Sequence, residues 1–238
     1  MKTIAIMQPY LFPYLGYFQL IQAVDDFIFF DDVNYIKKGW INRNNILANG
    51  QPSLFTVPII KASQNKKICD SYPLITDSWT EKFVNSLTQA YSKAPFFNES
   101  CSLVQKVFKS IDPKNSIADL AIQSIKSVLE YIDLEKSIML SSEISYNREG
   151  SGPEKIISIT KNLGAQHYVN PINGRELYSS EYFDDHGIKL SFIQMEEHLK
   201  YNQLNNSFIP NLSILDVLMY NSPEGIRQLL TKYTLLDG

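Results

Sequence analysis

Two adjacent carboxylates, Asp31 and Asp32, are the strongest candidates for acid–base chemistry in the sequence. An amine must be neutral before it can attack an acyl carbon, and one carboxylate could take its proton as a general base while the other orients it. A turn at the end of a strand would use the same pair differently, because aspartate side chains accept backbone hydrogen bonds in turns. If Asp32 is the base, its replacement by asparagine should lower turnover by roughly 10²–10⁴-fold and leave fold stability nearly unchanged.

Amides, an indole and a guanidinium group follow the two carboxylates closely. Arg43 could hold a phosphate because its planar guanidinium group offers two parallel N–H donors. The amides of Asn42 and Asn44, on either side of Arg43, could add hydrogen bonds to the same ligand. Trp40 could stack on a base or a sugar, although a single tryptophan is more often a partly buried packing residue. We therefore expect residues 40–44 to contact the substrate.

Two further clusters of aromatic and amide side chains each follow an apolar run. In the first, prolines stiffen the loop, and Gly16 would let the next helix approach a ligand closely. In the second, Asn173 and Gly174 could form a simple turn or contact a ligand. The candidate substrate-binding residues of these clusters and of the segment downstream are Gln8, Tyr10, Tyr14, Tyr17, Asn170, Asn173, Tyr201 and Gln203.

Other catalytic patterns are weaker. The three histidines match no metal pattern, and His198, in a polar stretch, is the one that we expect to be catalytic. Neither cysteine belongs to a CxxC pair, so the sequence predicts no metal site and no disulfide. Ser213 and Asp216 are best interpreted as a helix cap in which Asp216 completes a capping box. The absence of a nucleophile elbow or P-loop favours direct attack by an amine on an activated acyl donor.

The elements that position these residues alternate between strand and helix. Residues 3–7 and 26–30 are apolar runs typical of buried strands, with a stripe of helical spacing between them. A strand, a helix and a strand within about 30 residues form a βαβ unit, whose strands are parallel. Because ligands of open α/β sheets bind at the carboxyl ends of the strands, three loops should converge on one cleft. These loops are 8–17, 31–44 and 170–178.

The rest of the chain predicts an α/β protein with a Rossmann-like parallel or mixed sheet and a helical middle region. Asn49 and Gly50 indicate a hairpin turn, and Ser116 with Asp119 resembles a capping box that opens a long helix. Further helices are expected at 79–91, 153–164, 212–220 and 222–233, and further strands at 167–170 and 188–193. We expect one domain over residues 1–238, with subdomains 1–150 and 151–238 as an alternative.

Length, composition and charge narrow the class of protein. The 238 residues are 44% hydrophobic and 20% charged, which is ordinary for a globular protein. A net charge of −3 creates no global field that would attract nucleic acid. The N-terminal apolar run is too short for a signal peptide, and no stretch approaches the ~18 apolar residues of a membrane span. We therefore expect a cytoplasmic protein without a membrane partner.

The whole chain resembles the WbqC-like protein family in segments that run from residue 4 to about residue 221. The matching segments are Gln8-Pro9-Tyr10, Pro13, Gly16-Tyr17-Phe18, Asp31-Asp32-Val33, Trp40-Ile41-Asn42-Arg43-Asn44, Tyr91, Lys93-Ala94-Pro95, Leu163-Gly164-Ala165, Tyr168, Tyr201, Gln203, Phe208 and Leu212-Ser213-Ile214-Leu215-Asp216-Val217-Leu218. The resemblance implies a role in O-antigen and other surface-polysaccharide biosynthesis, including lipopolysaccharide. It implies an N-acyltransferase that adds glycine or another acyl group to a nucleotide-linked amino-dideoxy sugar. The implied partners are that sugar and an acyl or aminoacyl donor, with nucleic acid involved only if the donor is an aminoacyl-tRNA.

A second, weaker likeness concerns the segment from Pro13 to Tyr17. Its place after a strand is similar to the ATP-binding segment of nucleotidylyltransferases and pantothenate-synthetase-like ligases. Those enzymes carry a His-x-Gly-His signature there, and this segment has neither histidine. Two alternatives to the acyltransferase therefore stay open: an ATP-dependent ligase or nucleotidyl-transferring enzyme that would use ATP and Mg²⁺, and a nucleotide-sugar-binding protein without catalysis. No cofactor is certain.

Overall fold

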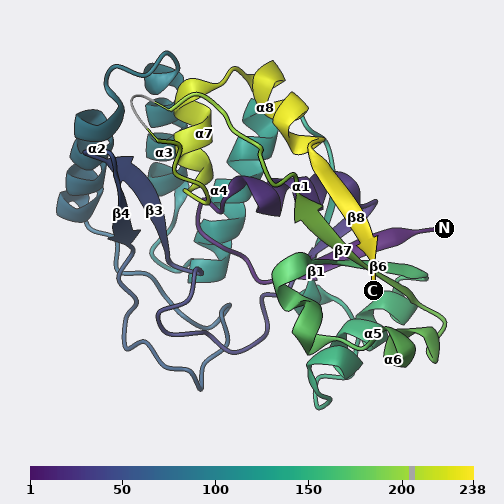
Figure 1. Ribbon diagram of the computed structural model, residues 1–238. Helices are drawn as coiled ribbons and strands as arrows, with labels where there is room; N and C mark the ends of the chain where they lie inside the picture. Colours follow the sequence, from purple (N-terminus) through teal and green to yellow (C-terminus); the bar gives the residue numbers. More distant parts are fainter. Residues whose placement is uncertain (204–206) are drawn as a thin grey trace.

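A mixed sheet of six strands forms the centre of the computed structural model, which describes residues 1–203 and 207–238 (Figure 1). The strands are β1 (Thr3–Met7), β2 (Asp26–Phe29), β5 (Ser137–Leu140), β6 (His167–Pro171), β7 (Lys189–Met195) and β8 (Tyr233–Asp237). Their spatial order is β5-β2-β1-β6-β7-β8, and every neighbouring pair is parallel except β7 and β8. The chain runs from β1 outward through β2 to β5, and then returns to the other side of β1 with β6. The crevice between β1 and β6 is therefore the point where a ligand site is expected.

Helices cover both faces of this sheet, which explains why its central strands are apolar on both sides. Ala5 of β1 belongs to the core beneath α1 (Leu15–Ala23) and α8 (Pro223–Leu230). Its neighbours Ile4 and Ile6 point the other way, into a second core with α5 (Gly152–Asn162) and α6 (Ser180–Asp184). Because successive side chains of a strand alternate between faces, one short strand contributes to both cores.

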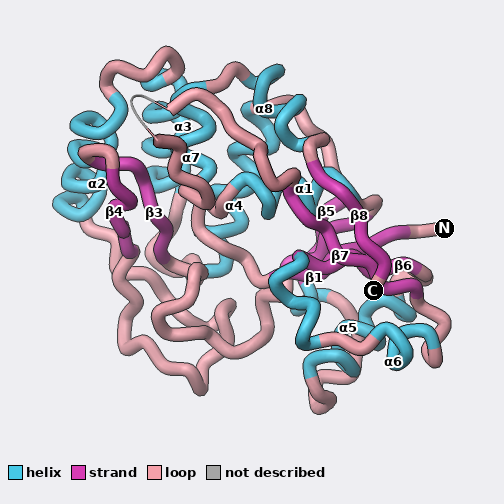
Figure 2. Tube along the Cα trace, viewed as in Figure 1, coloured by secondary structure: helices cyan, strands magenta, loops and turns pink. Residues whose placement is uncertain are grey.

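A second lobe carries the middle of the chain. It contains the hairpin of β3 (Arg43–Ala48) and β4 (Gln51–Thr56), together with α2 (Asp77–Tyr91), α3 (Phe97–Ser110), α4 (Ile117–Tyr131) and α7 (Ile214–Tyr220). Short 3₁₀ helices lie at Ser141–Glu143 and Ile172–Leu177. Residues between β2 and β3 and between β4 and α2 run mainly as loops (Figure 2). The first of these loops joins the carboxyl end of β2 to the hairpin, so we call this region the hairpin lobe; the second loop joins β4 to α2 within it.

Local signals in the sequence account for several of these elements. Asn49 and Gly50 both have positive φ, 51° and 70°, as the predicted hairpin turn requires. Ser116 and Asp119 form the predicted capping box at the start of α4. The predicted parallel pairing of the first two strands is confirmed, with Ile4 opposite Asp26 in β1 and β2.

One predicted element ends differently. The last helix was expected to reach Tyr233, but α8 ends at Leu230 and Tyr233 begins strand β8. This strand pairs antiparallel with β7, whose outer edge would otherwise present unpaired backbone groups to solvent. The sheet also spans both proposed subdomains, because β1, β2 and β5 precede residue 150 and the remaining strands follow it.

Candidate functional site

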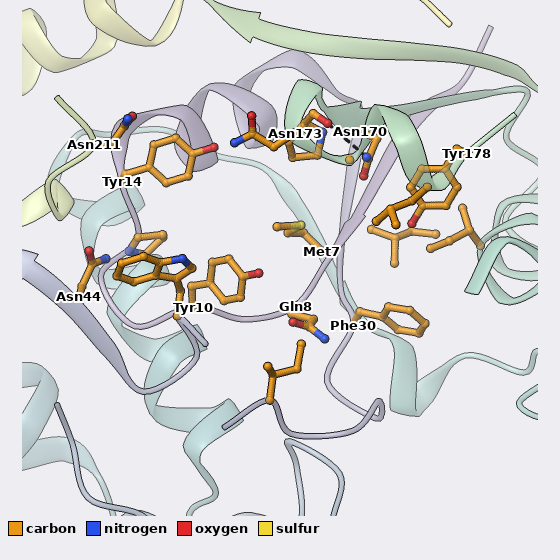
Figure 3. Close-up of a pocket in the computed structure, with 18 residues that line it drawn as sticks. Met7, Gln8, Tyr10, Tyr14, Phe30, Asn44, Asn170, Asn173, Tyr178 and Asn211 are labelled. Atoms are coloured by element: carbon orange, nitrogen blue, oxygen red, sulfur yellow. Dashed lines mark hydrogen bonds between the residues drawn. The ribbon is translucent and has the colours of Figure 1, made fainter. Parts of the chain in front are cut away.

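A cavity of about 690 Å³ opens at the carboxyl ends of β1, β2 and β6, and we call it the cleft. The three loops that were expected to meet there do so, although they are far apart in the sequence. The lining side chains are Ile6, Met7, Gln8, Tyr10, Pro13, Tyr14, Phe30, Ile36, Trp40, Asn44, Ile156, Asn170, Pro171, Asn173, Gly174, Leu177, Tyr178 and Asn211. None of these 18 residues carries a charge (Figure 3). The cleft therefore offers aromatic faces, apolar groups and neutral amides to a ligand.

The loop after β1 is held in an unusual backbone conformation. Phe12 is fully buried and has a positive φ of 41°, which a non-glycine residue rarely adopts. Its N–H donates to Oγ of Ser124 at 3.0 Å. Its carbonyl oxygen accepts from Nδ2 of Asn44 at 2.8 Å and from Oγ of Ser213 at 2.7 Å. Three distant segments thus fix the loop, as local strain requires.

The bracing of this loop aims two tyrosines into the cleft. The rings of Tyr10 and Tyr14 enter from the same side, and the hydroxyl of Tyr14 points toward Asn173 across the opening (Figure 3). Burial raises the pKa of Tyr10 to about 12, with a smaller contribution from Tyr14. Burial also raises the pKa of Tyr14. Both phenols are therefore protonated at neutral pH, and within the described residues neither hydroxyl has a hydrogen-bond partner. Each can donate to a ligand.

Gly16 and Tyr17 support these tyrosines. A Cβ atom on Gly16 would lie 2.4 Å from a ring carbon of Tyr14. The glycine was expected to let the helix approach a ligand, but the space that it leaves is filled by the ring of Tyr14. The buried Tyr17 does not line the cleft. Its hydroxyl donates to the carbonyl oxygen of Gln8 at 2.8 Å, and its ring centroid lies 5.7 Å from that of Tyr10. The predicted ligand contact of Tyr17 is therefore replaced by a contact within the protein.

The opposite wall of the cleft is formed by two amides, one near the end of β6 and one in the 3₁₀ helix that follows it. Asn170 accepts a hydrogen bond from the hydroxyl of Tyr168 at 3.0 Å and donates to the carbonyl oxygen of Pro171 at 3.2 Å. A Cβ atom on Gly174 would lie 2.2 Å from Nδ2 of Asn170, so only glycine leaves room for this amide. Asn173 faces the cleft from the same turn (Figure 3). The wall combines one fixed amide with one that is open to a ligand.

A second cavity of about 530 Å³ adjoins the cleft, and Gln8 and Ile36 line both. We call it the charged cavity. Its lining residues are Gln8, Asp32, Val33, Asn34, Ile36, Lys67, Tyr146, Arg148, Glu149 and Lys155. The charges of these side chains are three positive and two negative, which leaves +1. The two cavities differ in charge although they share a wall.

Asp32 is the best-connected group of the charged cavity. Its Oδ1 lies 2.5 Å from Oγ of Ser141 and 2.7 Å from the hydroxyl of Tyr146, and its Oδ2 accepts from Nε of Arg148 at 2.8 Å. Burial alone would raise the pKa of Asp32, but these hydrogen bonds and the Arg148 charge outweigh it and lower the pKa. Asp31 is also buried, and its Oδ1 lies 3.0 Å from Oγ of Ser141. With its lowered pKa and its oxygens occupied by these donors, Asp32 is poorly placed to collect a proton from a substrate.

Arg43 and Asn42 contact the protein rather than the cavities. Nε of Arg43 donates to the carbonyl oxygen of Gly39 at 2.9 Å, and its second donor reaches the carbonyl oxygen of Lys38. Asn42 is buried and donates to the carbonyl oxygen of Val57 at 2.7 Å. Both side chains stabilise the loop that carries the indole into the cleft. Neither lines the cleft or the charged cavity.

Tyr201 and Gln203 belong to a separate polar cluster around Asp216. The two oxygens of Asp216 accept from the hydroxyls of Tyr91 at 2.9 Å and Tyr201 at 2.7 Å, and from Nε2 of Gln203 at 2.9 Å. The interpretation of Asp216 as part of a capping box was wrong, because its carboxylate points inward and is fully buried. Burial raises the pKa of Asp216. Ser213 does cap α7, through the N–H of Leu215.

His198 lies away from both cavities. It is exposed in the turn after β7 and lines neither the cleft nor the charged cavity. The structure therefore gives it no neighbour with which to act as a catalytic acid or base there. No group of three or more histidine, cysteine, aspartate or glutamate side chains in residues 1–203 and 207–238 is arranged to hold a metal ion.

Several residues of the site were missed from the sequence. Lys67, Tyr146, Arg148 and Lys155 of the charged cavity are separated along the chain and belong to no motif. Asn211, which lines the cleft, has a positive φ of 59° in an irregular stretch. An Asn after a Pro is typical of a turn and by itself indicates no ligand contact. Only the folded chain brings these residues together.

One of the comparisons with known proteins identifies a family. The sequence model of the WbqC-like protein family matches residues 8–228. The chain is 28% identical over 219 residues to an uncharacterized protein of Mycobacterium tuberculosis, and the match covers 92% of this chain and 93% of that protein. No solved structure matches significantly. None of the helices in the described part of the chain combines the length and apolarity needed to cross a membrane.

Proposed function

Because the chain belongs to the WbqC-like protein family, we propose that it binds a nucleotide-linked amino sugar and transfers an acyl or aminoacyl group, such as glycyl, to the sugar amine. The observation that carries the proposal is the uncharged cleft at the carboxyl edge of the sheet. Sugars and nucleobases are neutral, have flat or apolar faces and carry many hydrogen-bonding groups. A wall of aromatic rings, amides and phenols complements all three properties.

The chemistry of such a cleft follows from its lack of charge. An amine that leaves water for an apolar site loses stabilisation of its ammonium form, so its pKa falls and the neutral nucleophile becomes more abundant. The amine nitrogen would bond to the acyl carbon while the bond from that carbon to the donor's leaving group breaks. The departing group takes the proton that nitrogen loses. No carboxylate of the protein is needed as a base in this route.

Gln8 is the residue best placed to assist the transfer. Its carboxamide lines both cavities, and within the described residues its side chain has no hydrogen-bond partner. Tyr17 holds the backbone of Gln8 through its carbonyl oxygen. An N–H of the carboxamide could stabilise the oxyanion that develops on the acyl oxygen, because a preorganised donor loses little on reorganisation. We assign this role to Gln8 within the proposal.

A panel reaction tests the function. The protein is incubated with nucleotide-linked amino sugars and with acyl donors, including acyl thioesters and aminoacyl-tRNA, and the products are identified by mass spectrometry. We expect one pair to give an N-acylated sugar, and Gln8→Ala to lower kcat by about 10²-fold if the amide stabilises the oxyanion. Gln194→Ala, on the exposed side of β7, is the matched control and should leave kcat unchanged.

Two other outcomes would redirect the proposal. Release of pyrophosphate from ATP during product formation would replace the acyltransferase with the ligase alternative. Tight binding of a nucleotide-linked amino sugar without turnover on any donor would favour a binding protein. Absence of both binding and turnover across the panel would contradict the proposed substrate class.

A further inference from the structure

We propose that the charged cavity is a diphosphate-binding subsite in which Lys67 and Lys155 hold the phosphates of the ligand. The inference rests on the proposed function in one respect, because it divides a single ligand between two adjoining cavities. The neutral parts of a nucleotide-linked sugar would occupy the cleft, and the diphosphate that joins them would occupy the charged cavity. Gln8 and Ile36 line the boundary where the ligand would pass from one to the other.

The two lysines are the uncompensated cations of the cavity. Arg148 forms an ion pair with Asp32 at 2.8 Å, and the guanidinium group also donates to the carbonyl oxygens of Ser141 and Ile144 at 3.2 and 3.0 Å. Within the described residues, neither Lys67 nor Lys155 forms an ion pair with a carboxylate. The cavity therefore contains one neutralised pair and two ammonium groups that can bind an anion.

The backbone that carries each lysine is fixed by hydrogen bonds. Lys67 forms an isolated antiparallel bridge with Asn34, and the adjacent N–H of Ile68 donates to the carbonyl oxygen of Val33 at 2.9 Å. Lys155 lies in the first turn of α5, where its N–H donates to the carbonyl oxygen of Ser151 at 3.0 Å. Both lysines line the same cavity although they belong to segments far apart in the sequence. An anion between them would be contacted by two separate elements.

The fixed ion pair beside the lysines has a consequence for selectivity. Asp32 keeps its negative charge close to the cavity, but Arg148 neutralises it and three donors surround its oxygens. Asp32 therefore adds no uncompensated negative charge next to the lysines. Glu149 remains as the one exposed acid among the lining residues. The site favours an anion with more than one charge, because two cations face one free acid.

This assignment replaces Arg43 as the expected phosphate ligand. Two nitrogens of Arg43, Nε and Nη2, donate to the carbonyl oxygens of Gly39 and Lys38, and its guanidinium carbon lies 5.7 Å from the ring centroid of Trp40. Its effect on a ligand would be indirect, through the position of the indole. Among the described residues, the side chains of Lys67 and Lys155 have no such partners, and both line the cavity.

The proposal is tested by calorimetric titration of the full chain with inorganic pyrophosphate, with uridine, thymidine and guanosine diphosphates, with ATP, and with the parent nucleosides. Lys67→Ala combined with Lys155→Ala should lower the affinity for each diphosphate at least about tenfold, since each lysine contributes a charged hydrogen bond. The nucleosides should bind the variant and the wild type equally. Lys66→Ala combined with Lys161→Ala removes the same charge from exposed positions outside the cavity and should change nothing.

The arms of this experiment separate the possible failures. Preference for a nucleoside diphosphate over ATP identifies the sugar nucleotide as the source of the phosphates, and the reverse identifies ATP. Unchanged diphosphate affinity in the Lys67 and Lys155 double variant, or no diphosphate binding by the wild type, would overturn the subsite. If the wild type acylates no sugar but the double variant still binds pyrophosphate more weakly than the wild type does, the subsite stands and the proposed reaction fails. Circular dichroism of both double variants checks that each is folded.

Discussion

The cleft and the charged cavity are adjacent but achieve order in opposite ways. In the cleft, the polar groups that face the opening have few partners, and the order lies in the backbone beneath them, as the buried Phe12 with positive φ shows. In the charged cavity, side chains hold each other in place: Asp32 forms an ion pair with Arg148 and accepts a hydrogen bond from Tyr146. The comparison separates groups that are free to bind from groups that hold the site together. Charge alone does not mark the functional residue.

The largest effect should come from breaking the ion pair of the charged cavity. Asp32→Ala leaves Arg148 without its partner and should lower the free energy of unfolding by about 3 kcal/mol, near the low end for buried pairs because Arg148 is half-exposed. Urea unfolding measures this effect. Glu149→Ala is the control in the same cavity, and as an exposed acid it should change stability by less than about 0.5 kcal/mol.

The same geometry reverses an expectation from the sequence about Asp32→Asn. The amide would turn an N–H₂ group toward the donors of Ser141, Tyr146 or Arg148, so a large loss of stability is expected instead of an unchanged fold. If Asp32→Asn is as stable as the wild type and its turnover is lowered by more than about 10²-fold, Asp32 is the base. The charged cavity would then contain a reacting group and not only groups that hold the site together.

Much of the sheet could be predicted because its signals are local. After their first residues, Thr3 and Asp26, strands β1 and β2 are entirely apolar, and the helix between them has the spacing that a βαβ unit needs. The meeting of three loops follows from parallel strands alone. Strand β8 was missed because Leu235 and its neighbours become a strand only through pairing with β7, a partner that the local sequence does not reveal.

The roles of single residues were harder to predict for a different physical reason. Amide and hydroxyl side chains bind a ligand or a backbone group with the same chemistry, and only the fold decides which is nearer. Tyr17 carries the same side chain as Tyr10, yet its hydroxyl bonds to the backbone of Gln8 while Tyr10 faces the cleft. Asn44 and Asn173 both line the cleft, yet the amide of Asn44 is used to brace the loop after β1. The lysines of the charged cavity belong to no motif at all.

The next largest effect concerns the indole of the cleft. Trp40 is 45% exposed and lines the cleft, so a base or sugar that stacks on it should lose about 1–3 kcal/mol of binding free energy in Trp40→Ala. Nucleoside titration measures the loss. Ligand binding should also quench the fluorescence of Trp40, and Trp40→Phe should abolish this quenching. The chain has two tryptophans, so the other one must be tested as a control.

Trp79 provides the control for that experiment. Its indole N–H donates to the carbonyl oxygen of Thr56 at 3.1 Å, and its ring stacks on Phe83 at 5.3 Å between centroids in the hairpin lobe. Trp79→Phe should therefore retain both the ligand affinity and the quenching of Trp40. Quenching that follows Trp79 instead would place the ligand away from the cleft and end the comparison of the two cavities.

A smaller effect should follow from a single methyl group beneath the cleft. Gly16→Ala places Cβ 2.4 Å from a ring carbon of Tyr14 and should displace that ring from its preferred rotamer. Because an off-rotamer side chain costs about 1 kcal/mol, the affinity for nucleosides should fall by about that amount. Gly225→Ala in α8 is the matched control, since its nearest contact would be 3.4 Å from Ser222 Oγ. Gly225→Ala should raise helix stability by up to about 1 kcal/mol without changing affinity. Equal affinities in the two variants would show that Tyr14 does not contact the ligand.

The smallest effect contrasts the two carboxylates through pH. Hydrogen bonds and the Arg148 charge lower the pKa of Asp32 against the effect of burial, so Asp32 stabilises the fold above its unfolded pKa of about 3.9, and this contribution is lost as pH falls through its folded pKa. Burial raises the pKa of Asp216, so the folded chain binds that proton more tightly. Its contribution is therefore greatest at low pH and declines as pH rises from about 4 through its raised folded pKa.

Differences between wild type and variant isolate these two contributions. The stability of the wild type relative to Asp216→Asn should decline as pH rises above about 4, by no more than about 1.4 kcal/mol per pH unit, because one proton is involved. Relative to Asp32→Ala, the wild type should keep a constant advantage above about pH 4 and lose it in more acidic solution. Urea unfolding at a series of pH values gives both differences. Parallel pH profiles for the two variants would mean that the buried carboxylate of Asp216 and the paired carboxylate of Asp32 are electrostatically alike.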